Sequence, residues 1–193
     1  MKKRNSRKAF AAIAIFLALA IFGSAGVVLL ANRYYPLRHT ETIKKYSVEY
    51  GLEPELVCAL IRAESRFKAD AVSRAGASGL MQIMEDTAYW LAPRAGLDDF
   101  DYAQILDPET NIRLGTYYLS ILIEHFGDIE VALCAYNAGR GNVASWLDNP
   151  EYSSDGKTLD AIPYAETREY VQKVMDNEKI YGFLLRFENI FSR

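Results

Sequence analysis

The sequence predicts a single all-α domain that follows one N-terminal membrane-spanning helix. Helix start and stop signals recur over residues 40–185, no useful stretch alternates apolar and polar residues as a strand would, and an uncharged apolar run lies near the N-terminus. The 193 residues, 50% of them hydrophobic, are enough for one core and an appendage. We therefore expect one helical body at 40–185 and a C-terminal tail at 186–193.

The N-terminal segment has the pattern of a membrane anchor. Residues 1–8 are rich in lysine and arginine, and residues 9–31 form an uncharged, almost wholly apolar run. A helix of this length, rising about 1.5 Å per residue, crosses a hydrocarbon core of roughly 30 Å, and the basic cluster stays in the cytoplasm. A cleaved signal peptide is the alternative, but its apolar region is normally about 7–15 residues long. We expect an uncleaved single-pass anchor in the cell membrane, a linker at 32–39 and an extracytoplasmic body.

The charge distribution argues against nucleic acid as a partner. The first 38 residues hold seven of the 22 lysines and arginines and none of the 25 acidic residues, so the body that follows is strongly acidic. Binding to nucleic acid requires clustered basic side chains. We expect a partner of another kind.

The cysteines and histidines do not form a metal-binding pattern. Cys58 and Cys134 are each flanked by apolar residues in expected helices, which favours two small buried side chains. A disulfide between them is the alternative in an exported protein, if the two helices touch. His39 and His125 are isolated from each other and from the cysteines, so the spacing predicts no metal site.

Proline, glycine and capping residues mark the helix boundaries along the body. The expected helices are 40–50 before Gly51, one opening at Glu53-Pro54, a short one from Thr87 to Leu91, one from Asp107-Pro108 to Gly127, one from Asp128 to about Gly139, and a closing helix at 165–185. The turn-rich stretch 70–79 and the polar stretch 148–160 are expected to lack regular structure.

Glu64 continues the apolar face of its helix. Val57, Leu60, Ile61 and Glu64 follow the i, i+3, i+4, i+7 spacing of one helical face. A carboxyl group in apolar surroundings is costly to ionise, so its pKa rises and it stays protonated near neutral pH, as a general acid must. The alternative is a glutamate at the exposed edge of the helix, and the spacing alone does not decide between them.

Four segments, in this order, resemble the soluble lytic transglycosylase family, whose catalytic domain is similar to goose-type lysozyme. They are 61–67 (IRAESRF), 76–84 (GASGLMQIM), 135–139 (AYNAG) and 162–171 (IPYAETREYV). The resemblance extends over about residues 40–185, and the four segments together are highly specific. It implies an all-α, lysozyme-like fold for the body.

The resemblance also implies roles for individual residues. Glu64 matches the single catalytic acid/base. Positions that contact the glycan or line its groove are matched by Ser73, Gln82, Met84, Tyr136, Asn137, Tyr164, Glu166 and Tyr170. Glu166 matches a buried acidic position, and Ser73 matches a hydroxyl that hydrogen-bonds the N-acetyl group of the muramoyl sugar.

Several of these residues also have a purely structural interpretation. Ser73 is suited to capping a turn, Met84 to filling the core with Ile83, Tyr170 to packing the last helix, and Glu166 to complementing a helix dipole. The chain departs from the family pattern at two segment edges. Glu85 follows Met84 where proline is usual, and Arg140 follows Gly139 where proline or glycine is usual.

The implied activity is that of a peptidoglycan lytic transglycosylase, without a metal or organic cofactor. Such an enzyme cleaves the bond from N-acetylmuramic acid to N-acetylglucosamine and closes a 1,6-anhydro ring on the muramoyl sugar. One alternative is a hydrolytic muramidase on the same fold, with Asp70 or Glu166 helping to activate water. Others are a non-catalytic glycan-binding scaffold and, least favoured, a helical adaptor with no glycan role.

Overall fold

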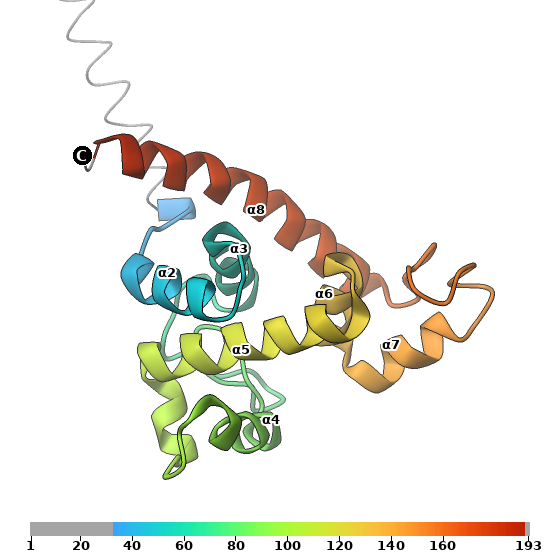
Figure 1. Cartoon of the computed structure of the whole chain (residues 1–193), viewed down its shortest axis with the longest axis horizontal. Helices are drawn as coiled ribbons and strands as arrows, with labels where there is room; N and C mark the ends of the chain where they lie inside the picture. The colour runs from blue at the N-terminus through green and yellow to red at the C-terminus, as the bar shows by residue number, and fades with distance from the viewer. Residues whose placement is uncertain (1–32, 192–193) are drawn as a thin grey trace, which may run out of the picture. The chain divides into compact units, whose positions relative to one another are not determined.

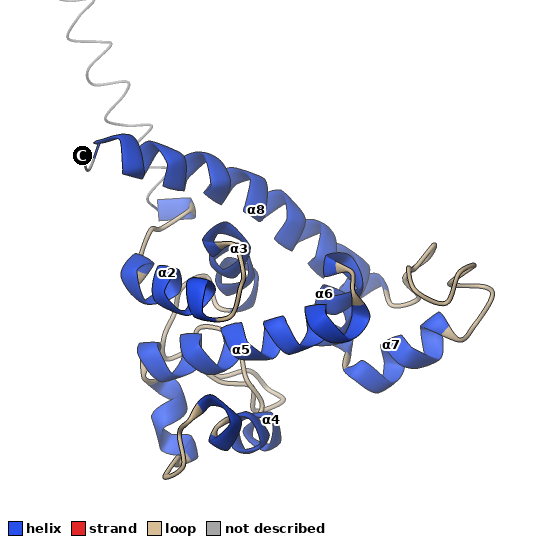
Figure 2. Cartoon of the chain, viewed as in Figure 1, coloured by secondary structure: helices blue, strands red, loops and turns tan. Residues whose placement is uncertain are grey.

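The computed structural model describes residues 33–191, with side chains to residue 186. Contacts divide the chain into Met1–Arg38 and His39–Arg193, and the fold described below is that of the second unit. Its helices are α2 (Thr40–Glu49), α3 (Pro54–Glu64), α4 (Glu85–Leu91), α5 (Pro108–Phe126), α6 (Ile129–Ala138), α7 (Arg140–Leu147) and α8 (Ala165–Phe191), with two 3-10 helices, η1 (Pro93–Ala95) and η2 (Tyr102–Leu106) (Figures 1 and 2).

The predicted all-α class is confirmed for the described part of the chain. Within it, the only β-type pairings are isolated antiparallel bridges from Ser78 to Val72 and to Ile83. None of the helices described is both long and apolar enough to cross a membrane. The basic segment expected at 1–8 and the anchor expected at 9–31 lie outside the described residues.

Capping residues begin and end the helices where the sequence predicts. The side chain of Asp107 accepts a hydrogen bond from the backbone N–H of Thr110, and that of Asp128 accepts one from Val131, both at 2.9 Å. Gly127 ends α5 in the left-handed conformation, with φ 72°. Side-chain caps and a glycine stop are local signals, which is why these boundaries are predictable.

Two features of the C-terminal region differ from the prediction. Helix α7 is not predicted, because it follows Gly139 at once and buries only Val143 and Trp146, which leaves little apolar periodicity. Helix α8 continues to Phe191 rather than ending at residue 185, so most of the expected tail is helical. No proline or glycine lies between 186 and 193 to stop it.

The core of the unit is built around α3. All six residues from Leu56 to Ile61 are buried, and α8 lies along this helix (Figure 1). Val174 and Tyr181 of α8 are fully buried against it, and the Tyr181 ring lies 6.0 Å from that of Phe67. Cys58 and Cys134 are also buried, as thiols, in α3 and α6. The packing of α8 on α3 fixes the C-terminal end of α3, where Glu64 lies.

A buried asparagine holds the loop before α4 in place. Asn111 of α5 is fully buried; its Oδ1 accepts a hydrogen bond from the N–H of Met81 at 2.7 Å, and its Nδ2 donates to the carbonyls of Ser78 and Ile105 at 3.0 and 2.9 Å. The loop approaches α5 and η2 closely at Gly79, where φ is +81° and a Cβ would fall 2.6 Å from Cγ of Asn111 and 2.8 Å from the Ile105 carbonyl oxygen. Asn111 therefore braces the segment that carries Gln82 and Met84.

We predict that Asn111→Ala lowers the free energy of unfolding by about 2 kcal/mol. The substitution removes the partner of the Met81 N–H and of the Ile105 carbonyl, at about 1 kcal/mol each, whereas the Ser78 carbonyl keeps the hydrogen bond from the N–H of Ile83. Urea denaturation of the full chain measures the change. Asn142→Ala, at an exposed asparagine of α7, is the matched control and should shift stability by less than about 0.5 kcal/mol. Equal effects of the two substitutions would contradict the bracing role of Asn111.

Candidate active site

Glu64 is the last residue of α3, and its carboxyl group is held against α8. Its Oε1 accepts a hydrogen bond from the hydroxyl of Tyr170 at 2.6 Å, across 106 residues of sequence. The side chain is partly buried, and the Nζ of Lys173 donates to the preceding carbonyl, that of Ala63, at 2.9 Å. The helical face predicted from the sequence is therefore correct, and Glu64 lies at the edge of the core rather than on the exposed edge of α3.

The surroundings of Glu64 suit a general acid. Burial raises the pKa of its carboxyl group to about 7, against opposing effects of the Tyr170 hydrogen bond and the positive charge of Lys173. A carboxyl group with this pKa is substantially protonated near neutral pH, and can give up a proton and take one back. Glu64 has the properties required of an acid that later acts as a base.

Two tyrosines lie near Glu64: Tyr170, which is buried, and Tyr136, which is partly buried. The hydroxyl of Tyr136 donates to the carbonyl of Met81 at 2.8 Å, and its ring lies 5.2 Å from that of Tyr118. Burial, followed by the nearby charge of Glu64, holds the pKa of both Tyr136 and Tyr170 well above the ordinary value. Both remain neutral phenols, so they can donate hydrogen bonds while adding no charge.

Two adjoining cavities form a groove that Tyr136 lines, whereas Tyr170 and Glu64 line neither of them. The first, about 280 Å³, is lined by Gln82, Ile83, Met84, Thr87, Tyr118, Tyr136, Asn137, Ala138 and Gly139. The second, about 560 Å³, is lined by Asn137, Ala138, Pro163, Tyr164, Ala165, Glu166 and Thr167. They share Asn137 and Ala138, so the groove passes from the loop before α4 to the start of α8. Below we call these two cavities the groove.

The structure brings most of the predicted substrate-contacting residues into the groove. Met84 is 44% exposed and lines the first cavity, whereas Ile83 is buried, so only Ile83 belongs to the core. Gln82 also lines this cavity, although its Nε2 donates to the backbone carbonyls of Ala71 and Gly79. The side-chain nitrogen of Gln82 therefore stabilises the conformation of the loop.

The second cavity gathers residues from the third and fourth segments. Asn137 accepts a hydrogen bond from the hydroxyl of Thr167 at 2.8 Å, which joins the end of α6 to the first turn of α8. Tyr164 is half exposed and packs edge-on against Trp146 at 4.9 Å. An exposed aromatic ring fixed at the wall of a groove offers an apolar face to a sugar.

Two predicted residues are placed differently from the expectation. Glu166 is exposed rather than buried, because it lies in the first turn of α8, where a carboxylate complements the helix dipole and remains hydrated. Ser73 does not line either cavity of the groove; its Oγ accepts a hydrogen bond from the N–H of Ala77 at 3.0 Å. This is the turn-capping interaction given above as the structural alternative for Ser73.

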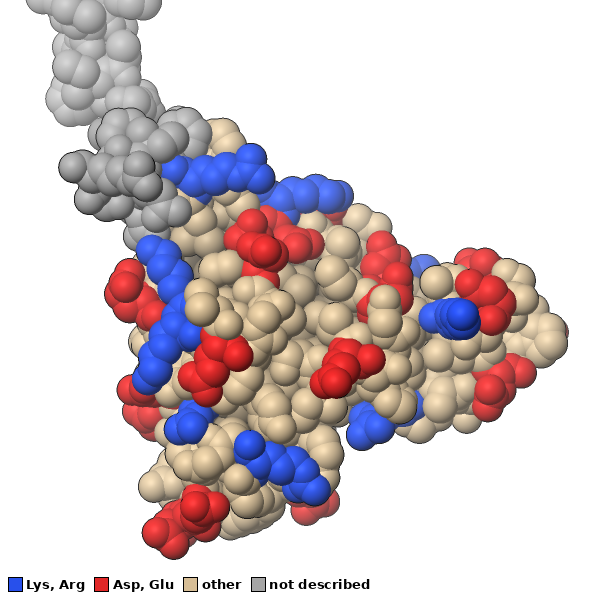
Figure 3. All heavy atoms as spheres, viewed as in Figure 1, with Lys and Arg blue, Asp and Glu red and all other residues tan. Residues whose placement is uncertain are grey.

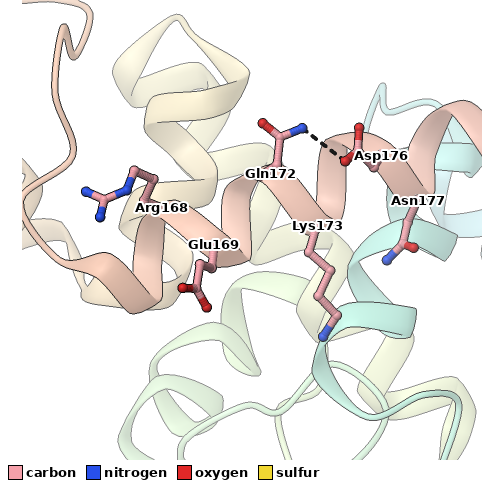
Figure 4. Close-up of a pocket in the computed structure, with 6 residues that line it drawn as sticks. All are labelled: Arg168, Glu169, Gln172, Lys173, Asp176 and Asn177. Carbon is pink, nitrogen blue, oxygen red and sulfur yellow. Dashed lines mark hydrogen bonds between the residues drawn. The ribbon is translucent and has the colours of Figure 1, made fainter.

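Sequence reasoning does not identify three residues that the structure places at the site. Thr87 and Tyr118 line the groove, and Lys173 reaches the end of α3 (Figure 4). Lys173 also belongs to a separate hollow of about 540 Å³ along α8, with the charged side chains of Arg168, Glu169 and Asp176. The three-residue spacing from Tyr170 to Lys173 on one helical face is the signal that could have found Lys173.

The charges of the body give no continuous basic surface on the face shown in Figure 3, where acidic and basic side chains are interspersed. No cluster of three histidine, cysteine or acidic side chains in the described part of the chain is arranged to hold a metal ion. The polar groups that line the groove include the carboxyl group of Glu166, the phenols of Tyr118, Tyr136 and Tyr164, and the amides of Gln82 and Asn137.

We predict that Glu64→Gln raises the free energy of unfolding at pH 8 by up to roughly 3 kcal/mol and changes it little at pH 4. The pKa of Glu64 rises from 4.5 to about 7 on folding, so the folded state holds the proton more tightly, and stability is lost as pH increases through this window. Urea denaturation at both pH values measures the difference. A gain of the same size at pH 4 and pH 8 would show that ionisation of Glu64 is not its origin.

The amino-acid sequence is similar to those of lytic murein transglycosylases. Residues 41–159 match the family described as Transglycosylase SLT domain, and residues 161–187 match the Soluble lytic transglycosylase helical domain. The chain is 35% identical over 154 residues to the soluble lytic murein transglycosylase of Escherichia coli K12, an alignment that covers 78% of this chain and 24% of the relative. It is 34% identical over 180 residues to the membrane-bound lytic murein transglycosylase C of Photorhabdus laumondii, covering 78% of this chain and 47% of the relative.

Solved structures show the same fold. An inactive mutant of the lytic transglycosylase Slt from Pseudomonas aeruginosa superposes with a TM-score of 0.72 at 35% identity, over 81% of this chain and 26% of that one. The 70 kDa soluble lytic transglycosylase of Escherichia coli gives a TM-score of 0.69 at 33% identity, over 78% of this chain and 25% of that one. The chain thus spans between about a quarter and a half of the length of these relatives. It belongs to the transglycosylase SLT domain family, with the lysozyme-like helical fold of that family.

Proposed function

We propose that this protein is a membrane-anchored lytic transglycosylase that cleaves the glycan strands of peptidoglycan. The observation that carries the proposal is the state of Glu64, a partly buried carboxyl group with a pKa of about 7 that lies among neutral phenols. Two kinds of relative, a soluble and a membrane-bound one, are named lytic murein transglycosylases. The groove that Tyr136 lines, with cavities of about 280 and 560 Å³, offers space for a ligand.

In the first chemical step, protonated Glu64 gives its proton to the oxygen that links N-acetylmuramic acid to N-acetylglucosamine. The bond from this oxygen to the anomeric carbon breaks, and the acetamido oxygen of the muramoyl sugar stabilises the positive charge that develops. Glu64, now a carboxylate, then removes the proton from the muramoyl 6-hydroxyl, whose oxygen attacks the anomeric carbon. A 1,6-anhydro ring forms, Glu64 regains its proton, and no water is consumed.

A mechanism with one carboxyl group fits the surroundings of Glu64 better than one with two. Retaining and inverting glycosidases ordinarily place a second carboxylate within about 5–10 Å. The groups that act on Glu64 in the described structure are a phenol and an ammonium, those of Tyr170 and Lys173, and not a second acid. Asp70 and Glu166, the candidates for activating water in a muramidase, are both exposed. This supports participation of the substrate's own acetamido group.

The surrounding residues have distinct proposed roles. Tyr170 positions the Glu64 carboxyl group through its hydrogen bond. Tyr136 orients the reacting sugar, and Met84 and Tyr164 supply apolar contact to sugar faces. Hydrogen-bonding groups for the glycan in the groove come from Gln82, Asn137 and Glu166. Ser73 lies outside the two cavities, and its hydroxyl, which accepts from the N–H of Ala77, can still donate to a longer glycan.

We also propose that residues 9–31 anchor the protein in the cell membrane with the catalytic domain, 40–185, outside. The apolar length of this run and the basic residues before it support the assignment. Relatives named as membrane-bound murein transglycosylases agree with attachment to the envelope. Such an anchor would restrict cleavage to glycan near the outer face of the membrane.

Digestion of purified peptidoglycan by the full chain tests the proposed activity. The parent protein should release muropeptides with 1,6-anhydromuramoyl ends, detected by mass spectrometry, and Glu64→Gln should release none, because its amide cannot donate the proton. Reducing-end products would instead identify a hydrolytic muramidase. Absence of release by the parent, with binding retained, would identify a non-catalytic scaffold.

We predict that Tyr170→Phe moves the alkaline limb of the pH–activity profile upward by up to about one pH unit. The Tyr170 hydrogen bond favours the carboxylate, so its loss raises the pKa of Glu64 and keeps the acid protonated at higher pH. The profile of kcat/KM measures the shift. Tyr152→Phe, away from Glu64, should leave the limb where it is, and an unmoved limb in Tyr170→Phe would contradict the positioning role.

A further inference from the structure

The carboxyl group of Glu64 lies at the negative end of a helix dipole. Glu64 is the last residue of α3, where the final carbonyls of the helix carry a partial negative charge. This charge and the burial of the side chain both favour the protonated form, and the phenols of Tyr136 and Tyr170 near it are neutral. The proposed reaction also needs the carboxylate, which exists from the first proton transfer until the 6-hydroxyl is deprotonated. A positive group at this end of α3 stabilises that form.

Lys173 of α8 supplies a positive group at this place. Its side chain extends from α8 toward α3 (Figure 4), and its Nζ donates a hydrogen bond at 2.9 Å to the carbonyl of Ala63, the residue before Glu64. Lys173 follows Tyr170 by three residues, so both side chains reach the end of α3 from one face of α8. The ammonium therefore caps the negative end of the helix that carries Glu64.

The charge of Lys173 is not neutralised by an acidic partner. Within residues 33–186, no carboxylate forms an ion pair with its Nζ. Burial and the positive charges of Arg66 and Arg62 lower the pKa of Lys173, whereas the charge of Glu64 raises it. The ammonium and the carboxyl group are therefore electrostatically coupled, although no hydrogen bond joins them.

Lys173, and not a neighbouring arginine, is the cation that acts on Glu64. Two groups oppose burial in setting the pKa of Glu64, and these are the Tyr170 hydroxyl and the Lys173 ammonium. Arg62 and Arg66 are each two residues from Glu64 in the chain, but neither is among the groups that shift its pKa. The sequence neighbours thus leave this task to a residue of α8.

We propose that Lys173 is a positioning residue, whose ammonium group caps α3 and stabilises the carboxylate form of Glu64 between the two proton transfers. This rests on the proposed function and deepens it, because it assigns to one cation the balance between the acid and base roles of Glu64. Lys173 lines neither cavity of the groove, so it is placed to act on Glu64 rather than on glycan in the groove.

Removal of the positive charge from the full chain tests the proposal. Lys173→Gln should raise the pKa of Glu64 by about 0.3 to 1 pH units, measured by NMR titration of its carboxyl carbon, because the carboxylate loses a favourable charge. The alkaline limb of kcat/KM on soluble glycan strands should move upward equally, and kcat should fall about two- to tenfold with KM within about twofold. Lys173→Met is a second neutral variant with the same expected result.

Two further variants serve as controls. Lys173→Arg keeps the positive charge and should restore the parent pKa and pH profile. Lys179→Gln removes another positive charge of α8, from an exposed lysine that pairs with Asp176, and should leave both unchanged. A thermal unfolding curve confirms that each variant is folded.

An unmoved pKa and an unmoved limb in the folded neutral variants would overturn the proposal, since a purely structural contact lowers activity alike at every pH. Failure of Lys173→Arg to restore them would also overturn it. The NMR titration needs no turnover, so failure of this inference and of the proposed activity are distinguishable. Anhydromuramoyl products with an unmoved pKa would reject the role of Lys173 alone, and a pKa that depends on Lys173 without products would reject the catalysis alone.

Discussion

The packing of α8 on α3 is the constraint on which the site depends. It brings the hydroxyl oxygen of Tyr170 to 2.6 Å from Oε1 of Glu64, and it allows Nζ of Lys173 to donate a hydrogen bond to the carbonyl of Ala63. The same contact removes water from one side of the carboxyl group, and this desolvation is the main cause of its raised pKa. Stability and chemistry are therefore opposed at Glu64, because the burial that prepares the acid makes its ionised form costly to the fold.

A second constraint shapes the substrate side of the groove. The loop that carries Gln82 and Met84 has little regular structure. Asn111 hydrogen-bonds two of its backbone groups, the carbonyl of Ser78 and the N–H of Met81, and also the carbonyl of Ile105 in η2. The hydroxyl of Tyr136 donates to the carbonyl of Met81. Buried polar groups in such a loop need partners to remain folded. Tyr136 thus links the loop to α6 as well as lining the groove. Its position is fixed by the hydrogen bond to Met81 and by the contact of its ring with that of Tyr118.

The sequence predicts those features that depend on local or periodic signals. Side-chain caps such as Asp107 and Asp128 lie at the helix starts they predict, and the apolar face of α3 correctly orients Glu64. The hydrogen bond from Tyr170 joins residues 106 positions apart, and no local pattern encodes that distance. The exposure of Glu166 is likewise a matter of which turn of α8 it occupies. Thr87 and Tyr118 reach the groove only through the packing of α4 on α5, which the residue pattern does not specify.

The measurement that tests this account most directly is an NMR titration of the Glu64 carboxyl carbon in the full chain, with Glu64→Gln used to assign the resonance. We expect a pKa of about 7, the value that burial against α8 produces. A pKa near 4.5, the ordinary value for glutamate, would contradict the account. It would mean that the carboxyl group is hydrated and ionised at neutral pH, and that the contact between α3 and α8 does not prepare it as an acid.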